Sequence, residues 1–214
     1  MNIRCNAMIL KKKPRNPADY PVLGILSQGP AHGYDVCREL REQLGEIWRL
    51  RTSHTYALLA GLEKDGLVCY ERVDQETRPA KKVFSITEEG RQKFLEWVRA
   101  PVASVRDIRL EFLAKLYFAR SISPAATTDL VSGQLSVCRS NIRRLTDRKR
   151  LCRPDIERAA LDFRLAMLHA VEAWLVGLGE PHHHDPGSRF HGPRTSLVKG
   201  DPTETVSKLG THQK

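Results

Sequence analysis

Hydrophobic residues in the first third of the chain recur at helical spacing and predict three short helices. The first is expected within residues 17–28, because the Gly-Pro pair that follows would end it. The second is expected over about residues 32–44. The third is expected to begin at Thr52 or Ser53, whose hydroxyls suit a helix start, and to stop at Gly66. Three short helices of this kind favour a helix-turn-helix, in which the second lies across the third.

Residues after the third helix have the composition of a β-hairpin. Strands are expected at residues 68–73 and 83–86, joined by a turn over residues 74–80 that contains a proline. Thr87 and the two acids after it suit the start of a fourth helix, which should stop near Pro101. The pattern therefore predicts a winged helix-turn-helix domain, with three helices and a two-stranded wing, over residues 17–100.

The second half of the chain predicts a separate helical domain over residues 104–178. A helix that is apolar on most sides is expected from Asp107 to Arg120, and two long helices are expected over about residues 124–152 and 154–178. Apolar residues recur in both long helices at alternating steps of three and four. They are Val131, Leu135, Cys138, Ile142 and Leu145 in the first, and Ile156, Ala160, Phe163, Met167, Ala170, Trp174 and Leu178 in the second. Such stripes favour antiparallel helix pairing, and the core could be completed within one chain or shared by two.

Charge and composition indicate which kinds of molecule the protein could bind and in which compartment it works. The net charge is +10, so nucleic acid or an anionic surface would attract the protein. No apolar run reaches the roughly 20 residues of a membrane helix, and the basic start lacks the apolar core of a secretion signal. The five cysteines show no metal or redox spacing, which favours free thiols in a reducing cytoplasm. Residues 1–16 are expected to form a flexible basic arm, and residues 179–214 a disordered tail.

The third helix and the hairpin carry the side chains expected to meet DNA. The outer face of the helix is small and polar, and the hairpin is tipped with cations, which suits a groove and its flanking phosphates. The residues expected in the major groove or at its rim are Ser53, His54, Thr55 and Tyr56. Those expected at phosphates are Arg78, Lys81 and Lys82, of which Arg78 could also enter the minor groove.

Several short segments in a fixed order resemble the PadR family of bacterial transcriptional regulators. The similar segments are residues 22–26 (Val-Leu-Gly-Ile-Leu), 29–34 (Gly-Pro-Ala-His-Gly-Tyr), Trp48, 55–59 and 62–68, and 78–84 with 87–90. The chain departs from the family at Ser53-His54, Ala57 and Phe84, so the operator sequence cannot be carried over. The resemblance implies a dimeric repressor, held together by its C-terminal helices and often released by a small ligand. It also implies that a pocket for an aromatic effector could involve Trp97 or Trp174.

Other functions find less support in the residues. No catalytic motif or phosphate loop is present, so we expect no enzyme and no cofactor. The run His182-His183-His184-Asp185 lies where nothing would fix a metal site, so no metal is expected. The cationic residues near the end of the first long helix could form a solvated face or contact acids such as Glu157 and Asp162.

The best interpretation is a ligand-responsive repressor that binds a palindromic operator in double-stranded DNA as a homodimer. One alternative is a protein-interaction module that uses the winged helix for docking. The other is a thiol-based redox-sensing regulator, which would need Cys37 or Cys69 to be exposed with a lowered pKa.

Overall fold

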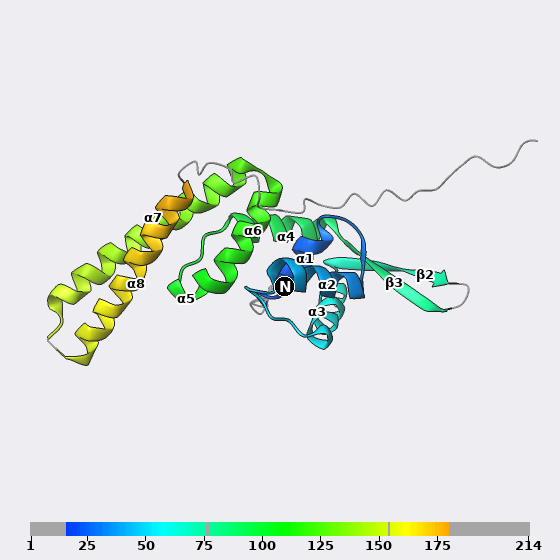
Figure 1. Ribbon diagram of the computed structural model, residues 1–214, viewed down its shortest axis with the longest axis horizontal. Helices are drawn as coiled ribbons and strands as arrows, with labels where there is room; N and C mark the ends of the chain where they lie inside the picture. The colour runs from blue at the N-terminus through cyan, green and yellow to red at the C-terminus, as the bar shows by residue number, and fades with distance from the viewer. Residues whose placement is uncertain (1–15, 76–77, 154, 180–214) are drawn as a thin grey trace, which may run out of the picture. The chain divides into compact units, whose positions relative to one another are not determined.

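The computed structural model describes residues 16–75, 78–153 and 155–179 (Figure 1). The predicted N-terminal arm, apart from its last residue, and the predicted tail, apart from its first, lie outside these residues. The winged-helix part runs through α1 (Asp19–Leu26), β1 (Ala31–His32), α2 (Gly33–Leu44), α3 (Thr52–Lys64), β2 (Val68–Gln75), β3 (Arg78–Ile86) and α4 (Glu88–Arg99). These elements confirm the three helices, the hairpin and the fourth helix that the sequence predicts.

Local signals position the hairpin between α3 and α4. Gly66 has a φ of 72°, a left-handed conformation that glycine adopts without steric cost, and it turns the chain from α3 into β2. Thr87 is the N-cap of α4, where its hydroxyl accepts a hydrogen bond from the Gly90 N–H (3.1 Å). The same hydroxyl donates to the Gly66 carbonyl (2.8 Å). The two ends of the hairpin are thereby tied together.

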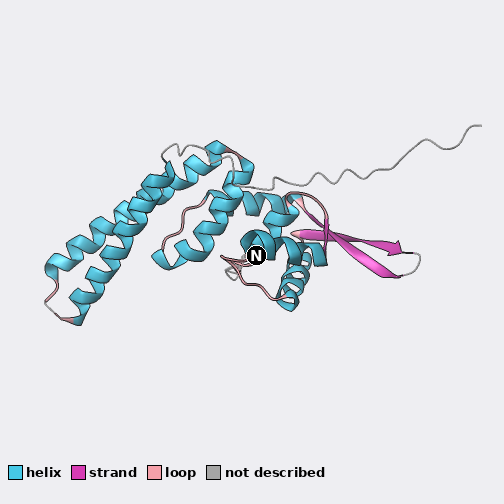
Figure 2. Ribbon diagram, in the orientation of Figure 1, coloured by secondary structure: helices cyan, strands magenta, loops and turns pink. Residues whose placement is uncertain are grey.

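The predicted seven-residue turn over residues 74–80 is wrong, because both strands continue into it. Val73 pairs with Lys81 and Gln75 with Arg78, after an irregularity in the register. The short strand β1, which the sequence analysis missed, adds to the other edge of β3 and gives the order β1-β3-β2. The long hairpin of β2 and β3 is drawn in magenta in Figure 2. Among the described residues, β1 pairs with Val83 and Phe84 alone, so in this part of the chain the outer half of β3 is an edge, where a proline is tolerated.

One hydrophobic cluster joins the winged helix to the helices that follow. Leu23, Leu59 and Phe94 are fully buried in it, and Phe118 of α6 (Leu113–Ile122) packs edge-on against Phe94 at 5.2 Å between ring centroids. Gly24 of α1 lies under this ring, since an added Cβ would stand 2.4 Å from the Phe118 Cζ. A close approach of this kind is open only to glycine.

The helical half begins less regularly than predicted. The expected helix from Asp107 to Arg120 consists of α5 (Val105–Asp107), a π-helical turn η1 (Ile108–Phe112) and α6. The two long helices, α7 (Pro124–Leu151) and α8 (Ile156–Gly179), agree with the prediction. Ser123 is the N-cap of α7 and accepts from the Ala126 N–H at 3.1 Å. No helix in the described ranges is long and apolar enough to span a bilayer.

Helices α7 and α8 pack antiparallel along their length. The Cys138 thiol lies 3.3 Å from the Leu168 carbonyl, and Lys149 pairs with Asp162. Arg139 and Arg148 pair with Glu172 and Glu157 at 2.8 and 2.6 Å. The basic end of α7 therefore contacts the acids of α8, which was one of the two readings that the sequence left open.

The face of α8 that meets α7 is not the predicted stripe. Four leucines of α8 are buried instead: Leu161, Leu165, Leu168 and Leu175. Of the predicted stripe, Phe163 is 66% exposed, and Ile156, Met167 and Trp174 are exposed as well. Helix α8 thus has two apolar faces, and only one of them is covered within the described part of the chain.

Candidate DNA-binding surface

The exposed face of α3 is small and polar, as the sequence predicts. Leu58, Leu59 and Leu62 are buried beneath the helix. Away from these leucines, the exposed residues of the helix are Thr52, Ser53, His54, Tyr56, Ala57, Ala60, Gly61 and Lys64. The first turn of α3 contains no acid, so the partial positive charge at the helix start is not neutralised there. This face can accept an anionic ligand and offers few large side chains to obstruct a groove.

The prediction that Thr55 faces the groove is wrong. Thr55 is only 1% exposed, and its hydroxyl donates to the Arg51 carbonyl at 3.4 Å. It also interacts with the thiol of Cys37 in α2, so it helps to hold α3 against α2. The spacing contained the signal for this, because Thr55 precedes Leu59 by four residues and Leu62 by seven.

Tyr56 lies at the seam between α3 and α2. Its ring is half exposed and packs against the start of α2 at Gly33. Burial raises the pKa of the Tyr56 hydroxyl, and the nearby Cys37 and Asp35 raise it further. The hydroxyl therefore stays protonated at neutral pH and can act as a hydrogen-bond donor at the surface.

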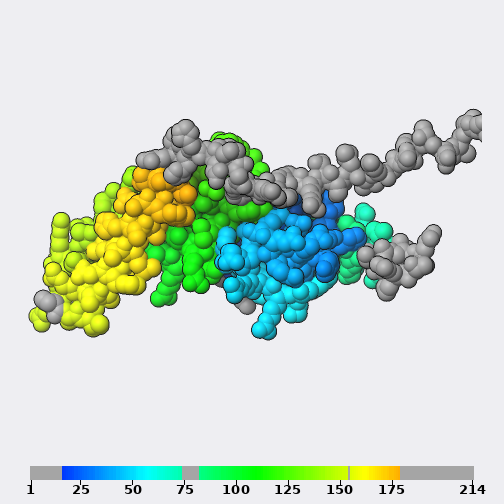
Figure 3. Space-filling view, viewed as in Figure 1, coloured from blue at the N-terminus to red at the C-terminus, as the bar shows by residue number. Residues whose placement is uncertain are grey.

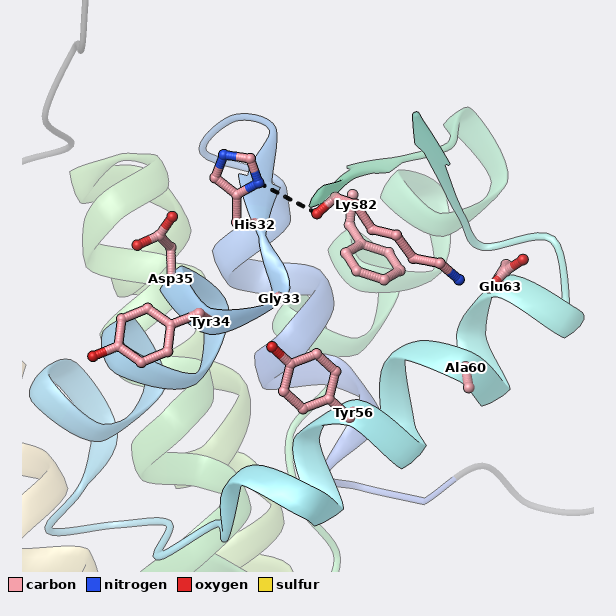
Figure 4. A pocket seen from close by; sticks show the side chains of 9 residues that line it. His32, Gly33, Tyr34, Asp35, Tyr56, Ala60, Glu63 and Lys82 are labelled. Carbon is pink, nitrogen blue, oxygen red and sulfur yellow. Dashed lines mark hydrogen bonds between the residues drawn. The ribbon is translucent and has the colours of Figure 1, made fainter. Parts of the chain in front are cut away.

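A groove of about 650 Å³ runs between the start of α2, the outer side of α3 and strand β3 (Figure 4). It is lined by His32, Gly33, Tyr34, Asp35, Tyr56, Ala60, Glu63, Lys82 and Phe84. The Nδ1 atom of His32 lies 3.4 Å from the Lys82 carbonyl oxygen, so this side chain links β1 to β3. His32 is the N-cap residue of α2, but its side chain makes no capping hydrogen bond. Asp35 is paired with Arg38 at 3.0 Å. The groove brings the third helix and the wing together on one surface.

The wing presents cations beside this groove. The Lys82 ammonium lies 3.8 Å from the centroid of the Tyr70 ring, a cation–π contact that restrains it. Arg72, which the sequence analysis missed, is exposed and lies directly opposite Lys82 in the hairpin. The sequence alone could not place Arg72 beside Lys82, because their proximity depends on how the two strands pair. The side chains of Arg78 and Lys81 lie outside the described part of the structure.

The two tryptophans weighed as effector contacts lie in different surroundings. Trp97 is only 7% exposed, stacks on Tyr20 at 4.9 Å and donates through Nε1 to Glu111 at 2.9 Å. Trp174 is partly exposed and makes its ring contact with Phe112, at 5.9 Å between centroids. Trp97 therefore belongs to the core, and Trp174 to the surface of α8.

The described residues contain no candidate metal site, and Cys37 does not suit thiol-based redox sensing. Burial raises the pKa of the Cys37 thiol, which is the opposite of what a reactive thiolate requires. Cys37 thus fails the condition set for a redox sensor, whereas Cys69 is exposed. Within residues 16–75, 78–153 and 155–179, no group of three or more His, Cys, Asp or Glu residues could hold a metal ion. The run His182-His183-His184-Asp185 lies outside these ranges.

The sequence of this chain is similar to those of known transcriptional regulators. Residues 22–96 match the model of the transcriptional regulator PadR-like family. The chain is 30% identical over 116 residues to the negative transcriptional regulator PadR of Bacillus subtilis, and the match covers 54% of this chain and 64% of that protein. It is 28% identical over 87 residues to a probable transcriptional regulator of Mycobacterium tuberculosis, covering 41% and 46%. The chain thus spans less than two thirds of either relative.

Solved structures of the Bacillus subtilis protein are also similar to this chain. Its complex with operator DNA shares 26% identity at a TM-score of 0.41, covering 76% of this chain and 97% of that one. Its complex with p-coumaric acid shares 25% identity at a TM-score of 0.37, covering 76% and 96%. The family that residues 22–96 match is one of transcriptional regulators. The winged-helix part of this chain, residues 22–96, is thus similar to the transcriptional regulator PadR-like family.

Proposed function

We propose that this protein is a sequence-specific transcriptional repressor that binds a palindromic operator as a homodimer and is released by an aromatic small molecule. The observation that carries the proposal is a surface on which Tyr56 and Ala60 of α3 line one groove with Lys82 of the wing, while the first turn of the same helix is exposed and free of acids. Helix starts and cations both favour phosphate, while side chains on the outer face of such a helix can read base edges.

DNA recognition divides between helix and wing. Ser53 and His54 occupy the exposed first turn of α3 and are assigned to base edges, with Tyr56 at the rim of the groove. Lys82, with Arg78 and Lys81, is assigned to phosphates that flank the groove. Arg72 joins this set because it lies opposite Lys82. The net charge of +10 adds a long-range attraction that does not depend on sequence.

Selection of bound duplexes from random DNA tests this proposal most directly. A repressor of this kind should enrich a palindrome whose half-sites lie about one helical turn, or a multiple of it, apart. Gel shifts at two salt concentrations then measure how much of the affinity comes from phosphates. A protein that enriches no sequence and binds no duplex at low salt would instead fit a protein-interaction module.

The wing cations should contribute affinity without sequence preference. The double substitution Lys81→Ala/Lys82→Ala should weaken binding to every duplex and reduce the log–log salt slope by ~2 units, at ~0.9 per lost phosphate contact. The measurement is the dissociation constant of one selected and one scrambled duplex over a series of salt concentrations.

A control variant separates local contact from total charge. Arg150→Ala/Arg153→Ala removes the same charge from the exposed end of α7 and just beyond it, and it should leave the slope nearly unchanged. Equal slopes for the wing variant and the parent protein would take the wing out of the interface.

The uncovered face of α8 supports the homodimer. Ile156, Phe163, Met167 and Trp174 form an exposed apolar stripe on a helix that lies along the surface of the molecule (Figure 3). A monomer that leaves such a stripe open would expose large apolar side chains to water. Pairing with the same stripe of a second copy buries it and supplies the two-fold axis that a palindrome requires.

Repression and release extend the proposal to regulation. The Bacillus subtilis relative is a negative regulator, and it has been crystallised with p-coumaric acid. A ligand releases DNA when it binds more tightly to a dimer whose reading helices have a different spacing. Tryptophan fluorescence reports such binding, because Trp97 lies near the junction of α4 with the helical half. Phenolic acids should change the emission, and a flat titration would remove this class of effector.

A further inference from the structure

Gly33 leaves no room for any side chain, and the reason is Tyr56. A Cβ built on Gly33 would lie 2.6 Å from Cε1, 3.2 Å from Cζ and 3.3 Å from the hydroxyl oxygen of Tyr56. Carbon atoms in proteins do not approach to 2.6 Å without a shift. The ring of the α3 tyrosine therefore rests directly on the backbone at the start of α2 (Figure 4).

The backbone at Gly33 cannot retreat from this ring. The two residues before it form β1, in which Ala31 pairs with Phe84 and His32 with Val83. The His32 ring is also 3.4 Å from the Lys82 carbonyl. Sheet pairing thus holds the start of α2 against β3. An atom added at position 33 must displace the ring, because the helix is anchored to β3.

Backbone conformation does not explain the glycine. Among the described glycines, positive φ angles occur at Gly29 and Gly66, while Gly33 is the first residue of a regular helix. Alanine would suit that position at least as well, since it favours helix more than glycine does. Glycine is therefore required at position 33 because the Tyr56 ring packs against its backbone.

We propose that Gly33 is a positioning residue for DNA binding, which holds the Tyr56 hydroxyl at the groove edge where it donates to a backbone phosphate of DNA. This inference rests on the proposed function. The ring is held between α2 and α3, so its hydroxyl need not be ordered anew when DNA arrives. Partial burial keeps the pKa of Tyr56 raised, and the hydroxyl thus remains a donor.

A double-mutant cycle tests the DNA part of the proposal. Tyr56→Phe removes the hydroxyl and keeps the ring, and it should weaken binding to the selected duplex about tenfold, as expected for a hydrogen bond to a charged group. Gly33→Ala should cause a loss of similar size. Because the hydroxyl is already absent in the second background, Gly33→Ala/Tyr56→Phe should be within about twofold of Tyr56→Phe alone. Losses that multiply in the double variant would overturn the proposal.

A second measurement needs no DNA. Tyrosine labelled at Cζ reports the pKa of each phenol by NMR, and Tyr56→Phe assigns the signal. Gly33→Ala should displace the ring and bring the pKa of Tyr56 back toward the ordinary tyrosine value, while the melting temperature stays near that of the parent. Gly61→Ala is the matched control, since a Cβ there meets no atom within 4 Å, and it should leave this pKa unchanged.

The two measurements separate the two ways of failing. A pKa of Tyr56 that does not respond to Gly33→Ala overturns the positioning role, whatever the protein does with DNA. A parent protein that binds no duplex refutes the proposed function, and the phosphate contact is refuted with it. In that case the NMR titration still shows whether Gly33 determines the position of the Tyr56 ring.

Discussion

Phe163→Glu should turn the dimer into a monomer and weaken binding to the palindromic duplex at least about 100-fold, the lower end of what linking two binding modules supplies. Phe163 is 66% exposed in the single chain, so the change should cost the monomer little stability. In the proposed dimer, the same position would bury a carboxylate in an apolar interface. Desolvation of the charge opposes that arrangement.

Molar mass by light scattering and a gel shift on the same samples measure this result. His169→Glu is the matched control, because it places the same new charge on an exposed position of α8 away from the stripe. That variant should stay dimeric and bind the duplex as the parent does. A Phe163→Glu protein that keeps the dimer mass would show that α8 does not form the interface through this face.

Glu111→Gln should lower the free energy of unfolding by about 3 kcal/mol, the lower end of the cost of leaving one member of a buried ion pair alone. Lys115 is only 3% exposed, and its ammonium lies 2.8 Å from Glu111 and 2.8 Å from the Ala100 carbonyl. The glutamine oxygen can still accept from Trp97. The substitution therefore removes the charge that balances Lys115 and little else.

An exposed pair of the same kind provides the control. Glu89 and Lys93 have the same order and the same four-residue spacing, but their side chains are 56% and 28% exposed, against 23% and 3% for the pair of Glu111 with Lys115. Glu89→Gln should cost less than about 1 kcal/mol, because solvent screens such a pair. Urea denaturation of both variants gives the comparison, and equal losses would mean that the burial of Lys115 has no energetic consequence.

The pH dependence of Glu111→Gln follows from the direction of the Lys115 pKa. Burial lowers this pKa, and the hydrogen bond and charge of Glu111 oppose the decrease, so removing the charge should lower it further. The folded protein then binds the proton less tightly than the unfolded chain, and stability from this group rises with pH between the two pKa values. The deficit of the variant should shrink as the pH is raised. A deficit that grows would contradict this account.

The sequence by itself determined the elements of the winged helix. The periodicity of α1, α2 and α3 and the N-cap at Thr87 act over a few residues, so they can be read without knowing the fold. The same is true of the polar outer face of α3 with Ser53 and His54. Thr55 could also have been assigned to the buried face, since its spacing to Leu59 and Leu62 is helical.

Only the tertiary structure decided features that depend on residues far apart in the chain. The length of the wing follows from pairing across β2 and β3, and β1 forms only because β3 is beside it. Gly33 and Tyr56 are 23 positions apart by number, 56 − 33, and meet only where α2 crosses α3. Helix α8 has apolar residues at helical spacing on two faces, and the face that packs on α7 is the one with the leucines. Local pattern can mark a face as apolar, but what covers it depends on the surfaces that folding brings to it.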